Sequence, residues 1–318
     1  MMKILITGVA GFIGSHLADT LLKSGFEVYG IDNLDDFYPR DVKLKNISQA
    51  LTNPAFHFFE FDITEKNAFH VLNNEKFDKI FHIAARAGVR PSIEAPEKYI
   101  KTNIAGTLNV LEYMRASKST KLIFASSSSV YGNCKVIPFT EETSVDELIS
   151  PYAFTKKSCE LLNYNYHHLY GLDIINLRFF TVFGPRQRPD LAIYKFMDRI
   201  EKNLPIEVYG DGSTARDYTY VDDIISGIIS AGEYLDNNKQ VYEIINLGNN
   251  SPVVLLDLIK TMQKCLNKEF EVVYKDMQMG DVDITFANIE KAKNLLVYEP
   301  KISFEEGISN FINWYYNK

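Results

Sequence analysis

The sequence predicts an α/β fold: a doubly wound parallel sheet with a smaller α/β lobe toward the C-terminus. Two observations predict it. Short apolar runs alternate with segments of helical periodicity through the first half of the 318-residue chain, which is typical of a parallel sheet covered on both faces. A glycine-rich turn joins the first apolar run to the first helical segment, as in Rossmann-type sheets.

Seven compact apolar runs are the predicted strands, and each is flanked by turn or polar residues. They are residues 3–7, 27–31, 56–61, 79–83, 121–126, 173–178 and 243–246. Three predicted helices are residues 12–24, 99–115 and 152–170. In the first of them Ile13, Leu17 and Leu21 recur every fourth position, and Gly25 supplies a stop.

The alternation of strands and helices weakens after residue 180, where turns occur at Gly184-Pro185 and at Gly210-Asp211-Gly212. We therefore expect a nucleotide-binding domain formed by residues 1–180 plus about 217–247. Residues 181–216 and 248–318 are expected to form the smaller substrate lobe. The ligand cleft should lie between the two parts.

Charge and composition argue against several function classes. Lys and Arg total 34 against 41 Asp and Glu, so the formal charge is −7 and binding of nucleic acid through the overall field is not expected. Cys134, Cys159 and Cys265 form no C-x-x-C pattern, which favours a reducing cytoplasm over a disulfide framework or a metal site. Apolar stretches are too short for a bilayer crossing, so we expect no membrane partner.

The turn after the first predicted strand is a candidate phosphate loop. It reads Gly8-Val9-Ala10-Gly11-Phe12-Ile13-Gly14, a G-x-x-G-x-x-G spacing that is one residue longer in its first interval than the usual fingerprint. Glycines allow a tight turn and close approach to a pyrophosphate, which the helix N-terminal amides then bind. Three glycines could also form an ordinary turn, but strand, glycines and helix follow one another in the order that the cofactor requires.

Asp32 ends the second predicted strand, where a carboxylate would accept hydrogen bonds from the adenosine ribose. It would repel a 2′-phosphate, so NAD is favoured over NADP. Asp62 follows the third strand and is interpreted either as an adenine contact or as a turn former. The other candidate cofactor contacts are Asn33, Ile63, Ala84, Ala85 and Asn103. The rest of the acidic stretch up to residue 41 is interpreted as a solvated loop.

Tyr152 and Lys156 are the candidate catalytic pair. They are four residues apart at the start of a predicted helix and therefore share one face. An ammonium close to a phenol lowers the phenol pKa from about 10 toward neutrality, which makes the tyrosine a usable base. Such pairs also arise by chance. The serines that end the fifth strand strengthen the interpretation, because Ser127 could bond the same substrate oxygen, although a serine-rich cap would explain the others.

Together these residues resemble those of a known family. The glycine loop, Ser127 and Tyr152-x-x-x-Lys156 are similar to the extended short-chain dehydrogenases/reductases, in particular the NAD-dependent nucleotide-sugar epimerases and dehydratases. Further segments are similar to those of UDP-glucuronate 4-epimerases, and the resemblance covers essentially the whole chain. These segments are residues 85–90, 126–132, 178–185, 188–190, 216–223 and 280–282.

The resemblance implies a bound NAD that is reduced and reoxidised within each turnover. Tyr152 would take the proton from the 4-hydroxyl of a UDP-sugar, with Lys156 lowering its pKa and Ser127 holding the oxygen. The implied reaction converts UDP-glucuronate to UDP-galacturonate through a 4-keto sugar. The alternatives are a 4-epimerase of another UDP-hexose, a UDP-glucuronate decarboxylase and, more remotely, a non-catalytic NAD-binding regulator, which the presence of all three residues disfavours.

A 4-keto uronic acid loses carbon dioxide easily, so an epimerase must control the orientation of the carboxylate. Arg188 and Thr181 are the candidates, since a guanidinium can bind a carboxylate at two points. A surface arginine in a Pro/Gly loop is the alternative for Arg188. Decarboxylating relatives typically carry glutamate at the position of Ser129, so the serine favours retention of the carboxylate. The full set of candidate substrate contacts is Ser127, Ser128, Ser129, Thr181, Arg188, Arg90, Arg216 and Asp281.

The resemblance also assigns the nucleotide contacts and a partner. Arg216 would bind the UDP phosphates and Asp281 would lie near the uridine ribose. Many relatives carry arginine where this chain has Gln278, so one phosphate contact is either missing or supplied by another residue such as Arg90. Relatives pair two long helices from each subunit, which here implies a homodimer through residues 99–115 and 152–170. A role in polysaccharide biosynthesis is expected at the level of the family.

Overall fold

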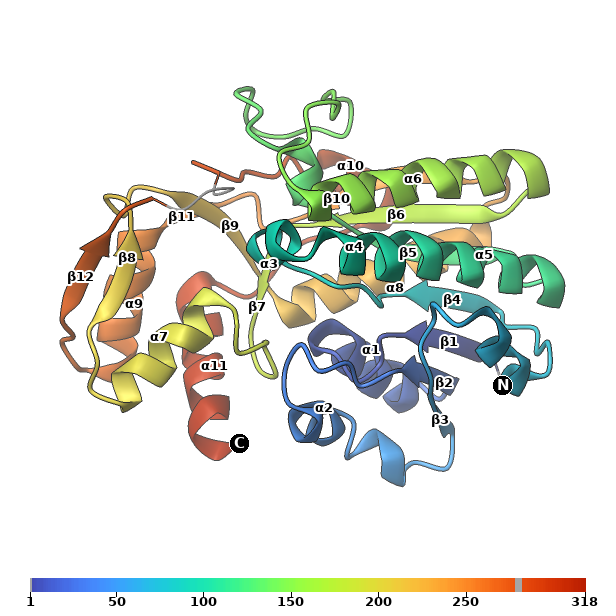
Figure 1. Cartoon of the computed structure of the whole chain (residues 1–318), viewed down its shortest axis with the longest axis horizontal. Helices are drawn as coiled ribbons and strands as arrows, with labels where there is room; N and C mark the ends of the chain where they lie inside the picture. The colour runs from blue at the N-terminus through green and yellow to red at the C-terminus, as the bar shows by residue number, and fades with distance from the viewer. Residues whose placement is uncertain (1, 278–281) are drawn as a thin grey trace.

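A seven-stranded parallel sheet forms the centre of the molecule (Figure 1), in the order β10-β6-β5-β4-β1-β2-β3. The computed structural model describes residues 2–277 and 282–318. The strands are β1 (Lys3–Thr7), β2 (Glu27–Asp32), β3 (Phe56–Glu60), β4 (Lys79–His82), β5 (Lys121–Ser127), β6 (Asp173–Phe179) and β10 (Tyr242–Leu247). All neighbours in this sheet are parallel. Each predicted strand is confirmed to within one residue at either end.

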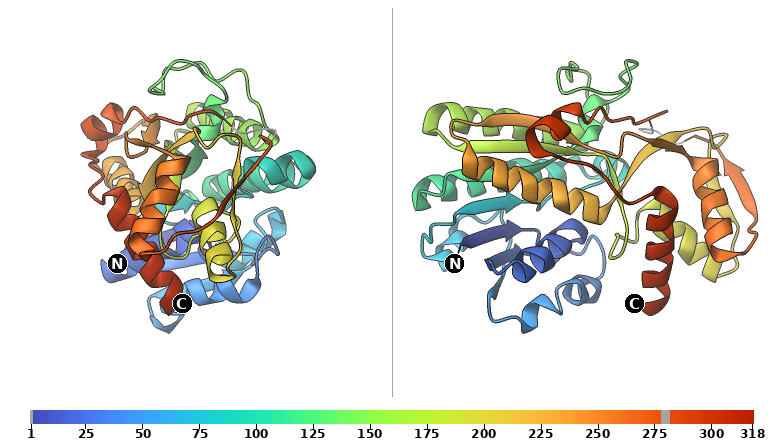
Figure 2. Two further views of the ribbon diagram at one scale, coloured as in Figure 1. Left: turned by 90° about the vertical axis from the view of Figure 1, so that its left-hand side faces the viewer. Right: turned by 180° about the vertical axis from the view of Figure 1, so that it is seen from behind.

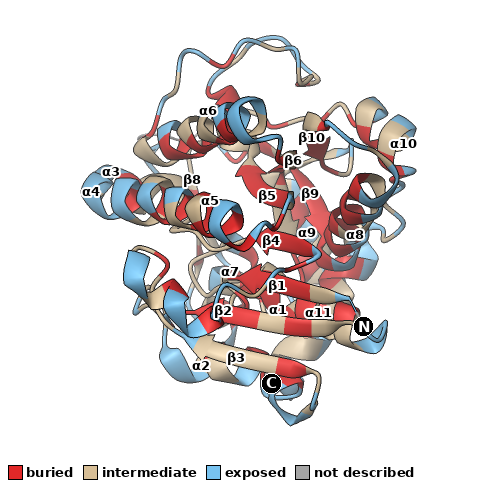
Figure 3. Ribbon diagram, turned by 90° about the vertical axis from the view of Figure 1, so that its right-hand side faces the viewer, coloured by how far each residue is buried: buried red, intermediate tan, exposed pale blue. Residues whose placement is uncertain are grey.

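Helices cover both faces of the sheet. On β1, Ile4 and Ile6 belong to the core cluster that includes helices α1 and α8, whereas Leu5 belongs to the cluster that includes α5 and α6. This alternation follows from the two-residue period of a strand. The covering helices are α1 (Phe12–Lys23), α8 (Val221–Asn237), α5 (Gly106–Ser117) and α6 (Pro151–Tyr170). Figure 3 shows the buried sheet strands enclosed between them.

The predicted helix 99–115 is interrupted. The segment consists of α4 (Pro96–Tyr99), a π-helical stretch (Ile100–Ala105) and α5. The main-chain oxygen of Asn103 accepts hydrogen bonds from the Thr107 hydroxyl (2.6 Å) and the Cys159 thiol (3.2 Å). π-Helical turns are rare in proteins, and those that occur often lie near functional sites. The periodicity of the sequence did not reveal this local widening of the helix.

The remaining strands form two small sheets at one end of the molecule, on the left in Figure 1 and on the right when viewed from behind (Figure 2). The first sheet has the order β11-β9-β7 and the second pairs β12 with β8. Their strands are β7 (Thr181–Phe183), β8 (Ile206–Tyr209), β9 (Ala215–Tyr220), β11 (Pro252–Val254) and β12 (Val272–Lys275), accompanied by α7 (Ala192–Glu201), α9 (Leu255–Leu266) and α11 (Phe304–Asn317). Short helices elsewhere are α2 (Arg40–Asn46), α3 (Val89–Glu94), α10 (Glu290–Leu296) and the 3₁₀ turns Ala50–Thr52, Lys66–Leu72 and Ser128–Tyr131.

Asp217 of β9 ties the small sheet to the segments beside it. Its side chain is fully buried and accepts hydrogen bonds from the main-chain N–H groups of Asn249 (2.7 Å), Asn250 (3.0 Å) and Ala287 (3.0 Å). Burial raises the pKa of Asp217, and these main-chain bonds oppose the rise. One buried carboxylate thus accepts bonds from three main-chain donors in two separate segments.

None of the helices in the described ranges combines the length and the apolar character that a bilayer crossing requires. The longest helix, α6, carries polar side chains along much of its length. The apolar side chains of the described residues are gathered mainly in the two clusters on either side of the sheet.

Replacing the buried carboxylate in Asp217→Ala should lower the free energy of unfolding by about 3 kcal/mol, because one buried and two partly buried N–H groups lose their acceptor. Urea unfolding followed by circular dichroism measures the loss. The matched control is Asp198→Ala on α7, where an exposed side chain pairs with Lys202 one turn away. Such pairs contribute about 0.3–0.5 kcal/mol. Equal losses in the two variants would contradict the role given to Asp217.

Candidate active site

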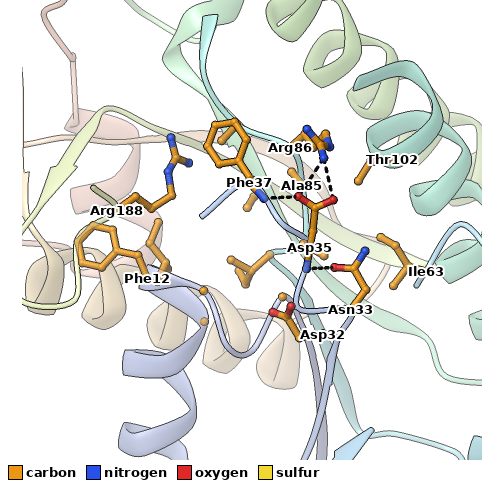
Figure 4. Close-up of a pocket in the computed structure, with 18 of the residues that line it drawn as sticks. Phe12, Asp32, Asn33, Asp35, Phe37, Ile63, Ala85, Arg86, Thr102 and Arg188 are labelled. Carbon is orange, nitrogen blue, oxygen red and sulfur yellow. Dashed lines mark hydrogen bonds and ion pairs between the residues drawn. The ribbon is translucent and has the colours of Figure 1, made fainter. Parts of the chain in front are cut away.

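A cavity opens at the carboxyl ends of β1, β2, β4 and β5, where the strand order reverses between β1 and β4 (Figure 4). Ligands of open α/β sheets bind at such a switch point. The structure brings together at this cavity most of the predicted cofactor and catalytic residues. Those that line it are Gly8, Gly11, Phe12, Ile13, Gly14, Asp32, Asn33, Asp62, Ile63, Ala84, Ala85, Tyr152, Lys156 and Arg188.

The glycine loop packs so tightly that side chains are excluded at two of its positions. A Cβ at Gly8, whose φ is +74°, would lie 2.7 Å from main-chain atoms of Ala84, and one at Gly14 would lie 2.1 Å from the Gly8 oxygen. Gly11 is the N-cap of α1 and brings no side chain to its first amides. The N-terminal end of this helix therefore offers main-chain donors and a partial positive charge to an anion in the cavity.

Asp32 is held at the end of β2 by the main chain. Its carboxylate accepts hydrogen bonds from Ala10 N (3.0 Å) and Leu34 N (2.8 Å). Burial raises the pKa of Asp32, while these bonds and the charge of Lys43 oppose the rise. A carboxylate fixed in this way retains lone pairs for further donors, such as the hydroxyls of a ribose.

The segment 33–39 is only in part the solvated loop that its acidic composition predicted: Asp36 is exposed, whereas Asp35 binds within the protein. Both carboxylate oxygens of Asp35 accept bonds from Nη2 of Arg86 (2.9 and 2.7 Å), and one of them also accepts a bond from Phe37 N (2.9 Å). The Phe37 ring lies 5.8 Å from the Arg86 guanidinium and 5.4 Å from that of Arg188, as Figure 4 shows. The segment therefore forms a wall of the cavity that joins residues from three distant parts of the chain.

Tyr152 and Lys156 reach the same cavity from the first turns of α6. Ser150 caps this helix by accepting a bond from Ala153 N (3.1 Å), and Pro151 occupies its first turn. Burial raises the pKa of Tyr152, whereas a hydrogen bond with Ser127 and the charge of Arg188 lower it. Lys156 is not among the groups that lower this pKa here, and its effect on the phenol stays a prediction.

The physical reason lies in where the ammonium is directed. Lys156 Nζ donates to the main-chain oxygen of Ala125 (2.5 Å) and lies 4.9 Å from the centre of the Phe124 ring. Burial lowers the pKa of Lys156 to about 8. Arg188, a residue 36 positions away that spacing could not connect to Tyr152, is a cation that lowers the pKa of the phenol.

Glu160, which sequence reasoning did not single out, fixes the end of β5 to α6. It lies one turn after Lys156 and is 1% exposed at its side chain. It accepts bonds from the Ser126 hydroxyl (2.6 Å) and from Nε and Nη2 of Arg178 (both 2.9 Å). Arg178 and Ser126 are partners across the β5–β6 ladder. The i, i+4 spacing from Lys156 is the sequence signal that could have pointed to this position.

Ser127, Ser128, Ser129 and Thr181 are not among the residues that line this cavity. Ser127 nevertheless bonds to Tyr152, and its hydroxyl accepts bonds from the main-chain N–H (3.2 Å) and the hydroxyl (2.8 Å) of Ser129. Ser128 and Ser129 open the 3₁₀ turn that follows β5, and Thr181 begins β7. The interpretation of some of these serines as a strand-to-turn cap therefore fits their geometry.

Asn103, a predicted cofactor contact, supports the cavity wall from behind and does not line it. Its side chain accepts a bond from Arg86 N (2.8 Å) and donates to Arg86 O (3.0 Å) and to the Thr155 hydroxyl (2.9 Å). These three bonds engage the amide oxygen as acceptor and the amide nitrogen as donor of two hydrogen bonds. Asn103 thereby connects the π-helical stretch to α6 and to the loop after β4.

Arg188 and Asp190 form a two-point ion pair within one loop. Nε and Nη2 of Arg188 each donate to an oxygen of Asp190 at 2.8 Å, and these bonds do not involve Nη1. The prediction of a solvated surface arginine is excluded, since Arg188 lines the cavity and acts on the pKa of Tyr152. An anionic ligand would meet a guanidinium that is already held in place by one carboxylate.

A second cavity adjoins this loop and contains the predicted phosphate-binding arginines. It is lined by residues of the small sheets, α7 and neighbouring loops, among them Arg90, Asp190, Tyr209, Arg216 and Tyr218. The Arg90 guanidinium lies 5.2 Å from the centre of the Tyr209 ring. Asp281 and Gln278 lie outside the described residues. In the described ranges, His, Cys, Asp and Glu side chains form no group of three that could hold a metal ion.

Comparison with known proteins places this geometry in a family. A model of the family described as GDP-mannose 4,6 dehydratase matches residues 5–311. UDP-glucuronate 4-epimerase of Thermodesulfobacterium geofontis is 44% identical over 312 residues, which are 98% of this chain and 95% of that protein.

Solved structures agree over the full chain. UDP-glucuronic acid 4-epimerase from Bacillus cereus, in complex with UDP-glucuronic acid and NAD, matches with a TM-score of 0.93 at 36% identity and 99% coverage of both chains. UDP-glucose 4-epimerase from Thermotoga maritima with UDP-glucose matches with a TM-score of 0.90 at 33% identity, again with 99% coverage of both chains. This chain therefore belongs to the GDP-mannose 4,6 dehydratase family of NAD-dependent epimerases and dehydratases.

Proposed function

We propose that the chain is an NAD-dependent epimerase that inverts carbon 4 of a UDP-sugar, converting UDP-glucuronate to UDP-galacturonate. The observation that carries the proposal is the position of Tyr152, which bonds to Ser127 and lies beside Arg188 in the cavity formed by the glycine loop. The proposal is supported by the relatives, since the Bacillus cereus enzyme of similar structure binds both UDP-glucuronic acid and NAD.

The residues of the first cavity fit NAD. The glycine loop would hold the pyrophosphate, Asp32 the adenosine ribose, and Asp62 with Ile63 the adenine side of the cavity. When bound there, NAD supplies the acceptor and donor of a hydride for carbon 4 and, in its oxidised form, a positively charged ring. Asp32 opposes a 2′-phosphate, which supports NAD rather than NADP.

Tyr152 is the proposed acid and base. Its phenol would take the proton from the 4-hydroxyl as the carbinol becomes a ketone, and it would return the proton after the opposite face of the sugar is presented. Burial raises its pKa, so positive charge is needed for it to act near neutral pH. Arg188 supplies part of that charge, and Ser127 would hold the substrate oxygen.

The substitution Tyr152→Phe should lower kcat about 10³-fold, because proton transfer to and from the 4-hydroxyl is lost. NMR analysis of UDP-glucuronate incubated with each protein measures turnover, and release of the nucleotide by denaturation measures NAD content, which should not change. The matched control is Tyr113→Phe, a buried tyrosine that bonds to Glu75 O away from the cavity. Undiminished turnover in Tyr152→Phe would remove the assignment of the base.

The same NMR assay separates the candidate reactions. UDP-galacturonate as product supports the proposed epimerase. A UDP-pentose would identify the decarboxylase, and conversion of UDP-glucose but not UDP-glucuronate would identify an epimerase of a neutral hexose. Absence of any product, with NAD retained, would support the non-catalytic regulator.

Arg188 is proposed to hold the substrate carboxylate. Loss of carbon dioxide from the 4-keto intermediate requires the bond to the carboxylate to stand perpendicular to the carbonyl plane. A guanidinium that holds the carboxylate at two points can prevent this orientation. The edge of Arg188 that includes Nη1 is not used by Asp190, and a substrate carboxylate at that edge would also be close to the group that acts on Tyr152.

The variant Arg188→Ala should weaken UDP-glucuronate binding roughly 10- to 100-fold more than UDP-glucose binding, since a charged hydrogen bond contributes about 1.5–3 kcal/mol. Isothermal titration of both nucleotides gives the two Kd values. Arg188→Lys serves as a control that keeps the charge and loses the two-point geometry. Its UDP-glucuronate affinity should lie between those of the unmodified protein and Arg188→Ala. Equal losses for the two ligands would exclude Arg188 as the carboxylate contact.

A homodimer is the proposed assembly. Apolar side chains stand exposed along the π-helical stretch, α5 and α6, where a four-helix interface would cover them. They are Ile100, Leu108, Phe154, Leu161, Tyr164, Leu169 and Tyr170. Contiguous exposed apolar side chains favour an interaction surface over solvent exposure.

Placing a charge on this surface in Leu161→Lys should produce a monomer of about 36 kDa by light scattering, because a lysine buried at the interface lacks a partner. The control is Leu51→Lys, at a leucine outside the proposed interface. Leu51 is 48% exposed, compared with 59% for Leu161. The control should keep the mass of the unmodified protein. A dimer that persists in Leu161→Lys would place the interface elsewhere.

The proposed division of labour assigns NAD to residues 1–180 plus about 217–247 and the UDP-sugar to residues 181–216 and 248–318. Both cavities meet the loop of Arg188 and Asp190, which supports a ligand that spans the two parts. The three free cysteines suit a reducing cytoplasm. Supply of a uronic acid sugar for polysaccharide biosynthesis is the proposed cellular role.

A further inference from the structure

We infer that Asp19 and Arg186 are positioning residues that determine how strongly the protein prefers a carboxylate over a hydroxymethyl group on its sugar ligand. The inference rests on the proposed role of Arg188. Neither Asp19 nor Arg186 lines either cavity described above, so both act through the loop that carries Arg188.

That loop, residues 184–190 between β7 and α7, has an unusual backbone. Gly184 has φ +138° and Arg186 has φ +61°, and Gln187 N bonds to Gly184 O (3.2 Å) to close the turn. A left-handed conformation is accessible to glycine but costs free energy in an arginine. Contacts outside the loop must therefore hold Arg186 in this conformation.

Two contacts with α1 do so. Arg186 Nη2 donates to Asp19 Oδ2 at 2.7 Å, and His16 Nε2 donates to Pro185 O at 2.9 Å. The side chains of Arg186 and Asp19 are only 21% and 14% exposed, so their attraction is screened less than that of a surface pair. Asp19 and His16 are one turn apart on α1 and hold consecutive residues of the loop.

The same helix begins at the glycine loop. Phe12, in its first turn, lines the cavity near Arg188 in Figure 4, and its ring packs edge-on against His16 at 5.9 Å. The loop of Arg188 is thus attached to the helix that lines the dinucleotide cavity. Without the ion pair, Arg186 would relax toward a right-handed conformation, and Arg188, two residues further on, would move relative to Tyr152.

Moving Arg188 is expected to affect binding of the sugar carboxylate and not binding of the nucleotide. Arg188 is the proposed contact for carbon 6, whereas the predicted contacts for the nucleotide, Arg90 and Arg216, lie in other elements. A displaced Arg188 would leave the predicted phosphate contacts Arg90 and Arg216 in place. Loss of the Asp19–Arg186 pair should therefore weaken binding of UDP-glucuronate and change binding of UDP-glucose little.

The test measures both Kd values by isothermal titration with the NAD-bound protein. Asp19→Ala should weaken UDP-glucuronate binding about 10-fold more than UDP-glucose binding. The double variant with Asp19→Arg and Arg186→Asp should restore most of the preference, because it re-forms the pair and aspartate tolerates a left-handed backbone better than arginine. Arg186→Ala, which removes the pair and keeps the cost of a left-handed backbone, provides the same test should Asp19→Ala not fold.

The matched control is Asp236→Ala, which removes a partly buried carboxylate paired with Lys79 and Lys121. It should lower Tm and leave the ratio of the two Kd values unchanged, as a merely structural role would. An unchanged ratio in Asp19→Ala and Arg186→Ala overturns the inference. If the unmodified protein itself shows no preference for UDP-glucuronate, the proposed role of Arg188 fails first, and that result is distinguishable from failure of Asp19 alone.

Discussion

The buried ion pair between Glu160 of α6 and Arg178 of β6 is the interaction on which the geometry of the site depends. Both side chains are 1% exposed, and two nitrogens of the guanidinium bond to the carboxylate. The hydrogen bonds and the positive charge of Arg178 keep the pKa of Glu160 low although burial opposes this. A buried charge left alone costs about 3–5 kcal/mol, so neither partner can be exchanged singly. The third bond, from Ser126, makes the pair a junction of β5, β6 and α6.

This junction places the groups that are proposed to react. Ser127 follows Ser126 directly, and Tyr152 precedes Glu160 by two turns of the same helix, so the bond between Ser127 and Tyr152 joins two residues that Glu160 holds in register. Lys156 bonds to Ala125 O in the same region. Ser127 ends a strand and Tyr152 lies in the first turn of a helix, so regular structure holds both residues, which favours the precise placement that proton transfer requires.

The sequence was sufficient for the central sheet and for the set of residues that share the first cavity. Strands buried on both faces are continuous apolar runs, and the ends of parallel strands meet at one edge, so residues far apart such as Gly8 and Tyr152 could be placed together. The small sheets were missed because strands such as β7 are too short to show a period. The sequence did not reveal the electrostatic partners of Asp35 and of Tyr152, and interpreting Asp35 as solvated was wrong. Arg86 with Asp35 and Arg188 with Tyr152 are pairs that no spacing rule connects.

Those pairs also explain how a chain of net charge −7 can accept two anionic ligands. The arginines at the cavity each carry a carboxylate supplied by the protein: Asp35 binds Arg86 and Asp190 binds Arg188. Such a partner fixes a guanidinium in place before a ligand arrives, which lowers the entropy cost of binding. It also reduces the attraction that the guanidinium offers to an anion. Because Asp190 occupies one edge of the Arg188 guanidinium, only a ligand that reaches the other edge can form hydrogen bonds with it. The built-in carboxylate therefore converts a general attraction for anions into a requirement for shape, which is the property that a site for one sugar acid among many phosphorylated metabolites needs.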